Sequence, residues 1–181
     1  YTWLCCFRCQ ATLETATGKL KRKAQQEEYP LKIAVAADHA GYDLKQAIIK
    51  RLEDSGHEVI DMGTNSAESV DYPVFAIDVA RAVSSATADR GLLVCGTGLG
   101  MCITANKVAG IRAVSPCDAA QAEMSRRHND ANVLCLGQRS IASEDALEIM
   151  SMWLDTPFEG GRHSRRLEMI AELEKDWPTP K

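Results

Sequence analysis

Residues 91–100 read Gly91-Leu92-Leu93-Val94-Cys95-Gly96-Thr97-Gly98-Leu99-Gly100, an apolar run that breaks directly into alternating glycines. The run from Leu92 to Cys95 predicts a buried β-strand. Because glycine has no β-carbon, an anion can approach the backbone N–H groups of the loop that follows. A glycine-rich turn that merely reverses the chain has the same pattern, so the other stretches must decide between the two interpretations. The pattern places Cys95 beside a candidate anion-binding loop.

Apolar runs of strand length alternate with helical periodicity on both sides of this stretch. Residues 32–37 show no polar alternation, which is typical of a strand covered on both faces. The predicted strands are 32–37, 57–60, 92–95, 111–114 and 132–136, and the predicted helices are 42–54, 73–85, a helix from the glycine loop to about 108, 119–127, 143–155 and 164–176. This order predicts an α/β fold, a single doubly wound (Rossmann-like) domain whose five-stranded parallel sheet is flanked by helices.

Composition limits the classes of partner. A formal net charge of −4 argues against non-specific nucleic-acid binding, and no apolar run approaches the roughly 20 residues that span a bilayer. Several of the seven cysteines are scattered through apolar segments, which is typical of small buried hydrophobes in a reducing compartment. We therefore expect a cytoplasmic protein without nucleic-acid or membrane partners.

The first 30 residues differ from the rest. They contain the basic run Lys19-Leu20-Lys21-Arg22-Lys23, followed by the polar run Gln25-Gln26-Glu27-Glu28. We expect residues 1–30 to form a flexible N-terminal extension and residues 31–181 to form the folded domain.

Polar residues follow four of the predicted strands at the point where each strand ends. These are Asp38-His39 after the first strand, Asp71-Tyr72 after the second, Cys95 to Gly100 after the third and Arg139 after the fifth. Parallel sheets bind ligands beyond the carboxyl ends of their strands. The sequence therefore predicts a binding site at this edge.

Two of these groups have a structural interpretation as well as a functional one. Asp38 is either the N-cap of a short helix or a carboxylate that faces a ligand together with His39. Cys95 is either a buried small hydrophobe or a nucleophile or base, since the glycine loop gives its sulfur exposure and favours the thiolate.

Basic residues also stand at two predicted helix ends. Residues 126–130 read Arg126-Arg127-His128-Asn129-Asp130, where cations complement a helix C-terminus and Asn129 suits a left-handed stop. Arg162 and Arg166 instead flank the start of the last helix, where cations oppose the helix dipole. This unfavourable placement indicates an anionic partner such as a phosphate group.

Seven motifs together carry a resemblance to a known family. They are Asp38-His39-Ala40-Gly41, Asp71-Tyr72-Pro73, Cys95-Gly96-Thr97-Gly98-Leu99-Gly100, Ala105-Asn106-Lys107, Gly110-Ile111-Arg112-Ala113, His128-Asn129-Asp130-Ala131-Asn132-Val133-Leu134 and Glu159-Gly160-Gly161-Arg162-His163. In this order they resemble the ribose-5-phosphate isomerase B family, which also includes the galactose-6-phosphate isomerase subunits. The resemblance covers roughly residues 32–174.

The resemblance implies a sugar-phosphate isomerase domain over 31–181, which interconverts ribose 5-phosphate and ribulose 5-phosphate in the pentose phosphate pathway without a cofactor or metal. Cys95 corresponds to the base that gives an enediolate, since Met101 stands where some relatives carry a glutamate base. Thr97 assists at the sugar oxygens, and His128 corresponds to the residue that opens the furanose ring. The implied substrate-binding residues are Asp38, His39, Tyr72, Gly96, Thr97, Gly98, Leu99, Gly100, Asn129, Arg139, Arg162 and Arg166.

The resemblance also implies a homodimer, or a tetramer of such dimers, with each active site shared between subunits. An aldose–ketose shift needs a base, a proton relay, an oxyanion cradle and an anion clamp, and all four are expected on one sheet edge.

Two alternatives stay open, and a third is disfavoured by the sequence. The first is an isomerase of a six-carbon substrate, allose or galactose 6-phosphate. The second is a non-catalytic sugar-phosphate-binding protein. A nicotinamide-dependent oxidoreductase fits the fold and Asp61, but its fingerprint belongs after the first strand, where the chain has Asp38-His39-Ala40-Gly41.

Overall fold

The structure is a computed structural model that describes residues 30–176. The predicted extension therefore lies outside the described residues except for Pro30. The elements follow in the order β1 (Lys32–Ala37), a 3-10 turn (His39–Gly41), α1 (Tyr42–Asp54), β2 (Glu58–Asp61), α2 (Tyr72–Ser84), β3 (Arg90–Cys95), α3 (Leu99–Ala105), β4 (Ala113–Val114), α4 (Ala119–Asn129), β5 (Val133–Gly137), α5 (Ser143–Asp155) and α6 (Arg162–Lys175).

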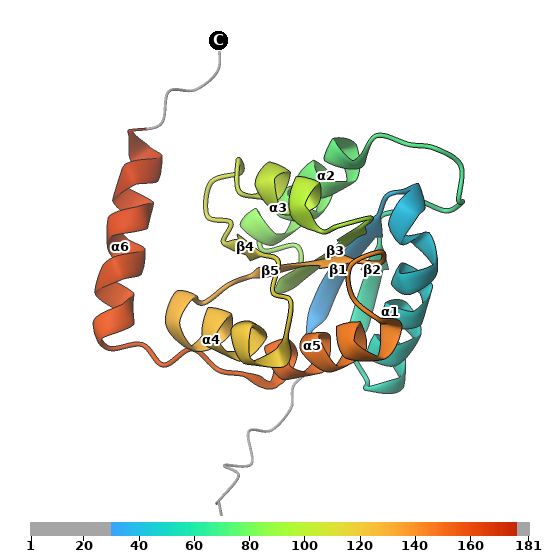
Figure 1. Cartoon of the computed structure of the whole chain (residues 1–181). Coiled ribbons are helices and arrows are strands. Elements are labelled where there is room, and N and C mark those ends of the chain that lie inside the picture. Colours follow the sequence, from blue (N-terminus) through green and yellow to red (C-terminus); the bar gives the residue numbers. More distant parts are fainter. Residues whose placement is uncertain (1–29, 177–181) are drawn as a thin grey trace, which may run out of the picture.

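The five strands form one parallel sheet in the order β2-β1-β3-β5-β4. Helices α2 and α3 cover one face, and α1, α4 and α5 cover the other (Figure 1). The α/β fold with a doubly wound parallel sheet is thus confirmed.

The core explains why the first strand lacks polar alternation. Ala34 and Ala36 pack into the cluster beneath α2 and α3, whereas Ile33 and Val35 pack into the cluster beneath α1 and α5. Both faces of β1 are buried from Ile33 to Ala37, so an apolar residue is favoured at each of these positions.

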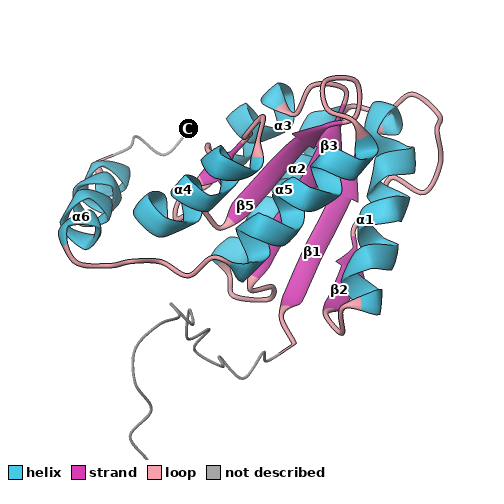
Figure 2. Cartoon of the chain, turned by 60° about the horizontal axis from the view of Figure 1, so that its bottom comes forward, coloured by secondary structure: helices cyan, strands magenta, loops and turns pink. Residues whose placement is uncertain are grey.

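Helix α6 lies apart from the layers that enclose the sheet (Figure 2). It follows Gly160 and Gly161, both at positive φ, and its far end is tied to the body where the Gly110 N–H donates to Glu174 Oε2 over 2.9 Å. Its buried residue is His163, whereas Met169, Ile170 and Leu173 are exposed by 64%, 44% and 66%. These three residues, which we call the α6 stripe, are apolar side chains left facing solvent in a single copy.

Several predicted boundaries were wrong for local reasons. β4 is shorter than predicted, and α3 ends at Ala105 because the Asn106 side chain bonds both the N–H and the carbonyl of Ala113 at 2.9 Å. α4 continues through Asn129, so the left-handed stop is Asp130 and not Asn129. Among residues 30–176, no helix is long and apolar enough to cross a membrane.

Candidate active site

The glycine loop connects the end of β3 to the start of α3. Cys95 is the last strand residue and is only 5% exposed, so the expectation that the glycine loop exposes its sulfur is wrong. Gly98 has φ +79°, and its N–H donates to Cys95 Sγ over 3.1 Å. A β-carbon at Gly98 would lie 2.6 Å from Ser115 Oγ, so this position excludes a side chain on both conformational and steric grounds. The loop therefore points at least one backbone donor at the cysteine sulfur.

The other cysteines within residues 30–176 differ in exposure. Cys135 is buried, and burial raises the pKa of its thiol well above the usual value, so it serves as a small core hydrophobe. Cys117 is exposed, which contradicts the expectation of burial at that position.

The segment after β1 contains Asp38 and His39. Asp38 Oδ1 accepts from the N–H groups of Ala40 and Gly41, so Asp38 is an N-cap, and this role of one carboxylate oxygen is compatible with a ligand contact through the other. His39 Nδ1 accepts from the Val70 N–H over 3.3 Å. Since Nδ1 is an acceptor here, the neutral imidazole carries its proton on Nε2, which remains a donor. His39 thereby links the loop after β1 to the loop that leads into α2.

Close backbone approaches bring the four predicted loops together. A β-carbon at Gly100 would lie 2.8 Å from the ring of Tyr72, and one at Gly96 would lie 3.6 Å from Arg139 Cδ and 3.7 Å from Ala40. Thr97 and Leu99 are exposed on the loop between these contacts. The structure thus brings together Asp38, His39, Tyr72, Cys95, Gly96, Thr97, Gly98, Leu99, Gly100 and Arg139 at the carboxyl edge of the sheet.

The second set of predicted residues lies elsewhere. His128 and Asn129 end α4, just before β5 begins at Val133. Val133 pairs with Gly91, whereas Gly137 pairs with Cys95, so the start of β5 lies about 13 Å along the strands from the level of Cys95. His128 therefore lies toward the amino ends of the strands, whereas Cys95 lies at their carboxyl ends. The expectation that all four catalytic functions share one edge is wrong within a single chain.

His128 packs against a second histidine that sequence reasoning left without a role. The His128 and His163 rings stack with centroids 4.3 Å apart and planes 8° apart. Glu159 Oε2 lies 3.8 Å from His128 Nε2 and 3.6 Å from His163 Nε2. The four-residue spacing of Glu159 and His163 is visible in the sequence, but the stack joins α4 to α6 and has no local signal.

Charges around this stack shift two pKa values. Burial, followed by repulsion from His128, Arg162 and Arg166, lowers the pKa of His163. The hydrogen bond and charge of Arg127 lower the pKa of Glu159. The fold thus favours a neutral His163 beside an ionised Glu159.

Donor atoms of His128, Glu159 and His163 lie within 4.8 Å of one another, which raises the question of a metal site. The two rings are nearly parallel, so their lone pairs lie in separate planes and do not converge on one ion. In addition, the Arg162 Nε–H donates to His163 Nε2 over 3.3 Å, and Arg127 pairs with Glu159. This arrangement opposes binding of a cation.

Arg162 and Arg166 occupy the first two turns of α6. Because the helix begins at Arg162 and not at the predicted residue 164, their four-residue spacing places both on one face. Both side chains are exposed. They are therefore available to an anion, next to the stacked histidines.

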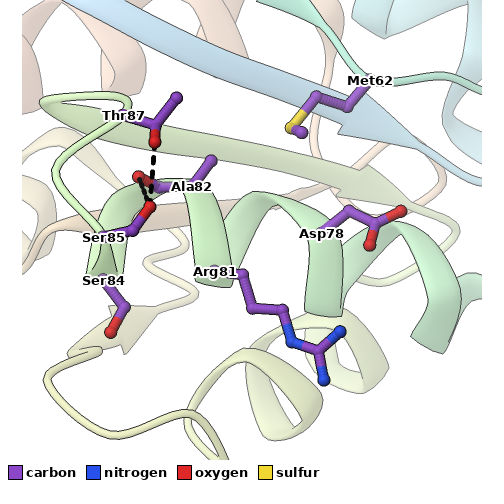
Figure 3. A pocket seen from close by; sticks show the side chains of 7 residues that line it. All are labelled: Met62, Asp78, Arg81, Ala82, Ser84, Ser85 and Thr87. Atoms are coloured by element: carbon purple, nitrogen blue, oxygen red, sulfur yellow. Dashed lines mark hydrogen bonds between the residues drawn. The ribbon is translucent and has the colours of Figure 1, made fainter.

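A hollow of about 600 Å³ lies elsewhere, along the C-terminal half of α2 (Figure 3). Its lining residues are Met62, Asp78, Arg81, Ala82, Ser84, Ser85 and Thr87. None of them is a predicted site residue, and none supplies an imidazole or thiol. This hollow is therefore not the site predicted at the carboxyl ends of the strands.

Comparison with known proteins gives one consistent family. The family model described as Ribose/Galactose Isomerase matches residues 33–170. The chain is 49% identical to ribose-5-phosphate isomerase B of Escherichia coli over 144 residues, which cover 80% of this chain and 97% of that protein.

Solved structures agree. The chain resembles ribose-5-phosphate isomerase B of Clostridium thermocellum with a TM-score of 0.81 and 51% identity, covering 82% of this chain and all (100%) of that one. It resembles the ribose-5-phosphate isomerase B of Mycoplasma genitalium, solved with bound ribulose-5-phosphate, with a TM-score of 0.77 and 40% identity, covering 81% and 97% of the two chains.

Proposed function

The chain belongs to the ribose/galactose isomerase family, and from this premise we propose that it interconverts ribose 5-phosphate and ribulose 5-phosphate through an enediolate. The observation that carries the proposal is Cys95, held at the mouth of a glycine loop whose Gly98 N–H donates to its sulfur. Relatives named ribose-5-phosphate isomerase B at 49% and 41% identity support the choice of substrate.

Cys95 is the base of the proposed reaction. The Gly98 N–H donates to the Cys95 sulfur and fixes its position, and this sulfur removes the proton next to the carbonyl. Met101 is fully buried and apolar, so that position supplies no alternative base. The N–H groups of the glycine loop stabilise the enediolate, and each such donor contributes about 3–4 kcal/mol in the transition state. Thr97 assists at the sugar oxygens.

The remaining residues open and hold the sugar. His128 moves the proton that opens the furanose ring, beside Asn129. Asp38, His39 and Tyr72 contact the sugar or phosphate from the carboxyl edge, and Arg139, Arg162 and Arg166 bind the phosphate. Arginine suits this task because its planar guanidinium makes paired hydrogen bonds to phosphate oxygens.

A homodimer reconciles these roles with the geometry. Cys95 ends β3, whereas His128 lies on α4 before the start of β5, and this separation supports a site built from two chains. In a two-fold dimer, His128 and α6 of one copy reach the glycine loop of the other, and two equivalent sites form. The α6 stripe and the exposed side chains of Val74, Leu99 and Ile103 provide apolar surface for such an interface. A tetramer built from two such dimers is the alternative assembly.

The proposed reaction belongs to the pentose phosphate pathway and would run in the cytoplasm. Its test is turnover of ribose 5-phosphate by the purified chain, compared with allose 6-phosphate and galactose 6-phosphate. Cys95→Ala is the matched control for contaminating isomerase. We expect kcat/KM to be highest for the five-carbon substrate. Preference for a six-carbon substrate would reassign the substrate, and binding without any turnover would instead favour a non-catalytic binding protein.

A further inference from the structure

The residue that ends α4 adopts an unusual backbone conformation. Asp130 has φ +44° and ψ +45°, in the left-handed region. Glycine is the usual residue in this region at a helix end, and asparagine and aspartate occupy it only occasionally, because the β-carbon crowds the following carbonyl. Surrounding contacts must therefore hold Asp130 in place, only two residues after His128.

Arg112 supplies the first set of contacts. Its Nε–H donates to the carbonyls of Asn129 and Asp130 over 2.9 and 3.0 Å. Its Nη2 donates to the Asp130 carbonyl over 2.8 Å and to Asp130 Oδ2 over 2.9 Å. The backbone of Arg112 is fixed in turn, since its N–H donates to Asn132 Oδ1 over 2.8 Å. The fork-shaped guanidinium thus binds carbonyls at the end of α4 that the helix leaves unpaired.

Arg126 binds Asp130 from the other side. Its Nη1 donates to Asp130 Oδ1 over 2.7 Å and to the Ala131 carbonyl over 2.6 Å. The Arg126 side chain is only 3% exposed, and its Nε–H donates to the Thr156 carbonyl. Each carboxylate oxygen of Asp130 therefore bonds a different guanidinium. We call Arg112, Arg126 and Asp130 the Asp130 clamp.

We propose that the Asp130 clamp positions His128 and Asn129 for the reaction. The inference rests on the proposed function of these two residues. The last turn of a helix frays unless its end is fixed, and His128 is still partly exposed there. The clamp holds the main chain at Asn129 and Asp130, while the stack on His163 holds the imidazole. Arg112 and Arg126 act through His128 and Asn129 and are positioning residues.

The test is a double-mutant cycle built on Arg112→Met. Methionine keeps an unbranched apolar side chain but removes all four hydrogen bonds that the Arg112 guanidinium donates. In the otherwise unchanged protein, we expect kcat for ribose 5-phosphate to fall about tenfold, because a small misplacement of a reacting group is costly. KM should change less than about twofold, because the phosphate-binding arginines are untouched. In a background that carries both His128→Ala and Asn129→Ala, Arg112→Met should have almost no further effect. Arg81→Met, an exposed arginine on α2, is the matched control and should leave both parameters unchanged.

Equal losses from Arg112→Met in both backgrounds, or no loss in either, would overturn the positioning role. Failure of the proposed role of His128 can be told apart from failure of the positioning role, because His128→Ala alone would then leave turnover of ribose 5-phosphate unchanged. If Arg112→Met does not fold, Asp130→Gly replaces it, because glycine adopts positive φ freely while the clamped carboxylate is lost. The same pattern across the two backgrounds is then expected, and its absence would reject the proposal.

Discussion

Cys95 Sγ accepts a hydrogen bond from the Gly98 N–H over 3.1 Å, three residues further along the chain. The left-handed conformation of Gly98 turns that N–H back toward the strand end. The Cys95 residue is only 5% exposed, so the Gly98 N–H contacts a sulfur that is largely shielded from water.

Replacement of this sulfur tests its role as base. Cys95→Ala should lower kcat for ribose 5-phosphate by at least about 10²-fold, as expected when a general base is lost, while substrate binding is largely retained. Turnover and binding are measured on the same preparation. Cys135→Ala is the matched control, since Cys135 is a buried thiol on the neighbouring strand. Near-normal kcat in Cys95→Ala would refute the assignment.

The arginines of α6 are tested by ligand comparison. Arg166→Ala should weaken binding of ribose 5-phosphate much more than binding of unphosphorylated ribose, because the lost hydrogen bonds go to the phosphate. Arg165→Ala, on the same exposed helix but turned by about 100°, should leave both affinities nearly unchanged. Calorimetry gives both affinities. Equal weakening of the two ligands by Arg166→Ala would mean that Arg166 is structural.

Stability should respond to pH through His163. Its pKa is lowered in the folded chain, mainly by burial, so the unfolded chain binds this proton more tightly. The stabilisation from neutral His163 is present above the unfolded pKa of about 6.5 and is lost as the pH falls below it. His163→Asn should therefore show a flatter decline of melting temperature between about pH 7.5 and 5.5, at fixed protein concentration. Parallel curves for the two proteins would contradict this linkage.

The N-terminal residues provide a test of domain organisation. Deletion of residues 1–29 should leave activity and melting temperature nearly unchanged, because residues 18–28 are mostly polar or charged and the family match begins only at residue 33. A large loss of either property would show that these residues dock on the domain.

Most of the fold and one half of the candidate site followed from local patterns. Apolar runs without alternation predict strands buried on both faces, and parallel strands align their carboxyl ends, so Asp38, Tyr72, Cys95 and Arg139 were predicted to meet.

The other half depends on contacts that have no local signal. The sequence predicts the left-handed stop at Asn129, yet Asp130 takes that conformation because Arg112 and Arg126 bind its carboxylate. His163 carried no predicted role, because its stack on His128 forms only when α6 folds back beside α4.

Subunit mixing tests the shared site most directly. Cys95→Ala and His128→Ala subunits are unfolded together in equal amounts and allowed to reassociate at random. Half of the dimers are then mixed, and each mixed dimer holds one site with both lesions and one with neither. The account predicts that roughly a quarter of the unsubstituted activity reappears from two nearly inactive parents. If mixed dimers demonstrably form and activity stays at the parental level, Cys95 and His128 do not act in a site shared between subunits.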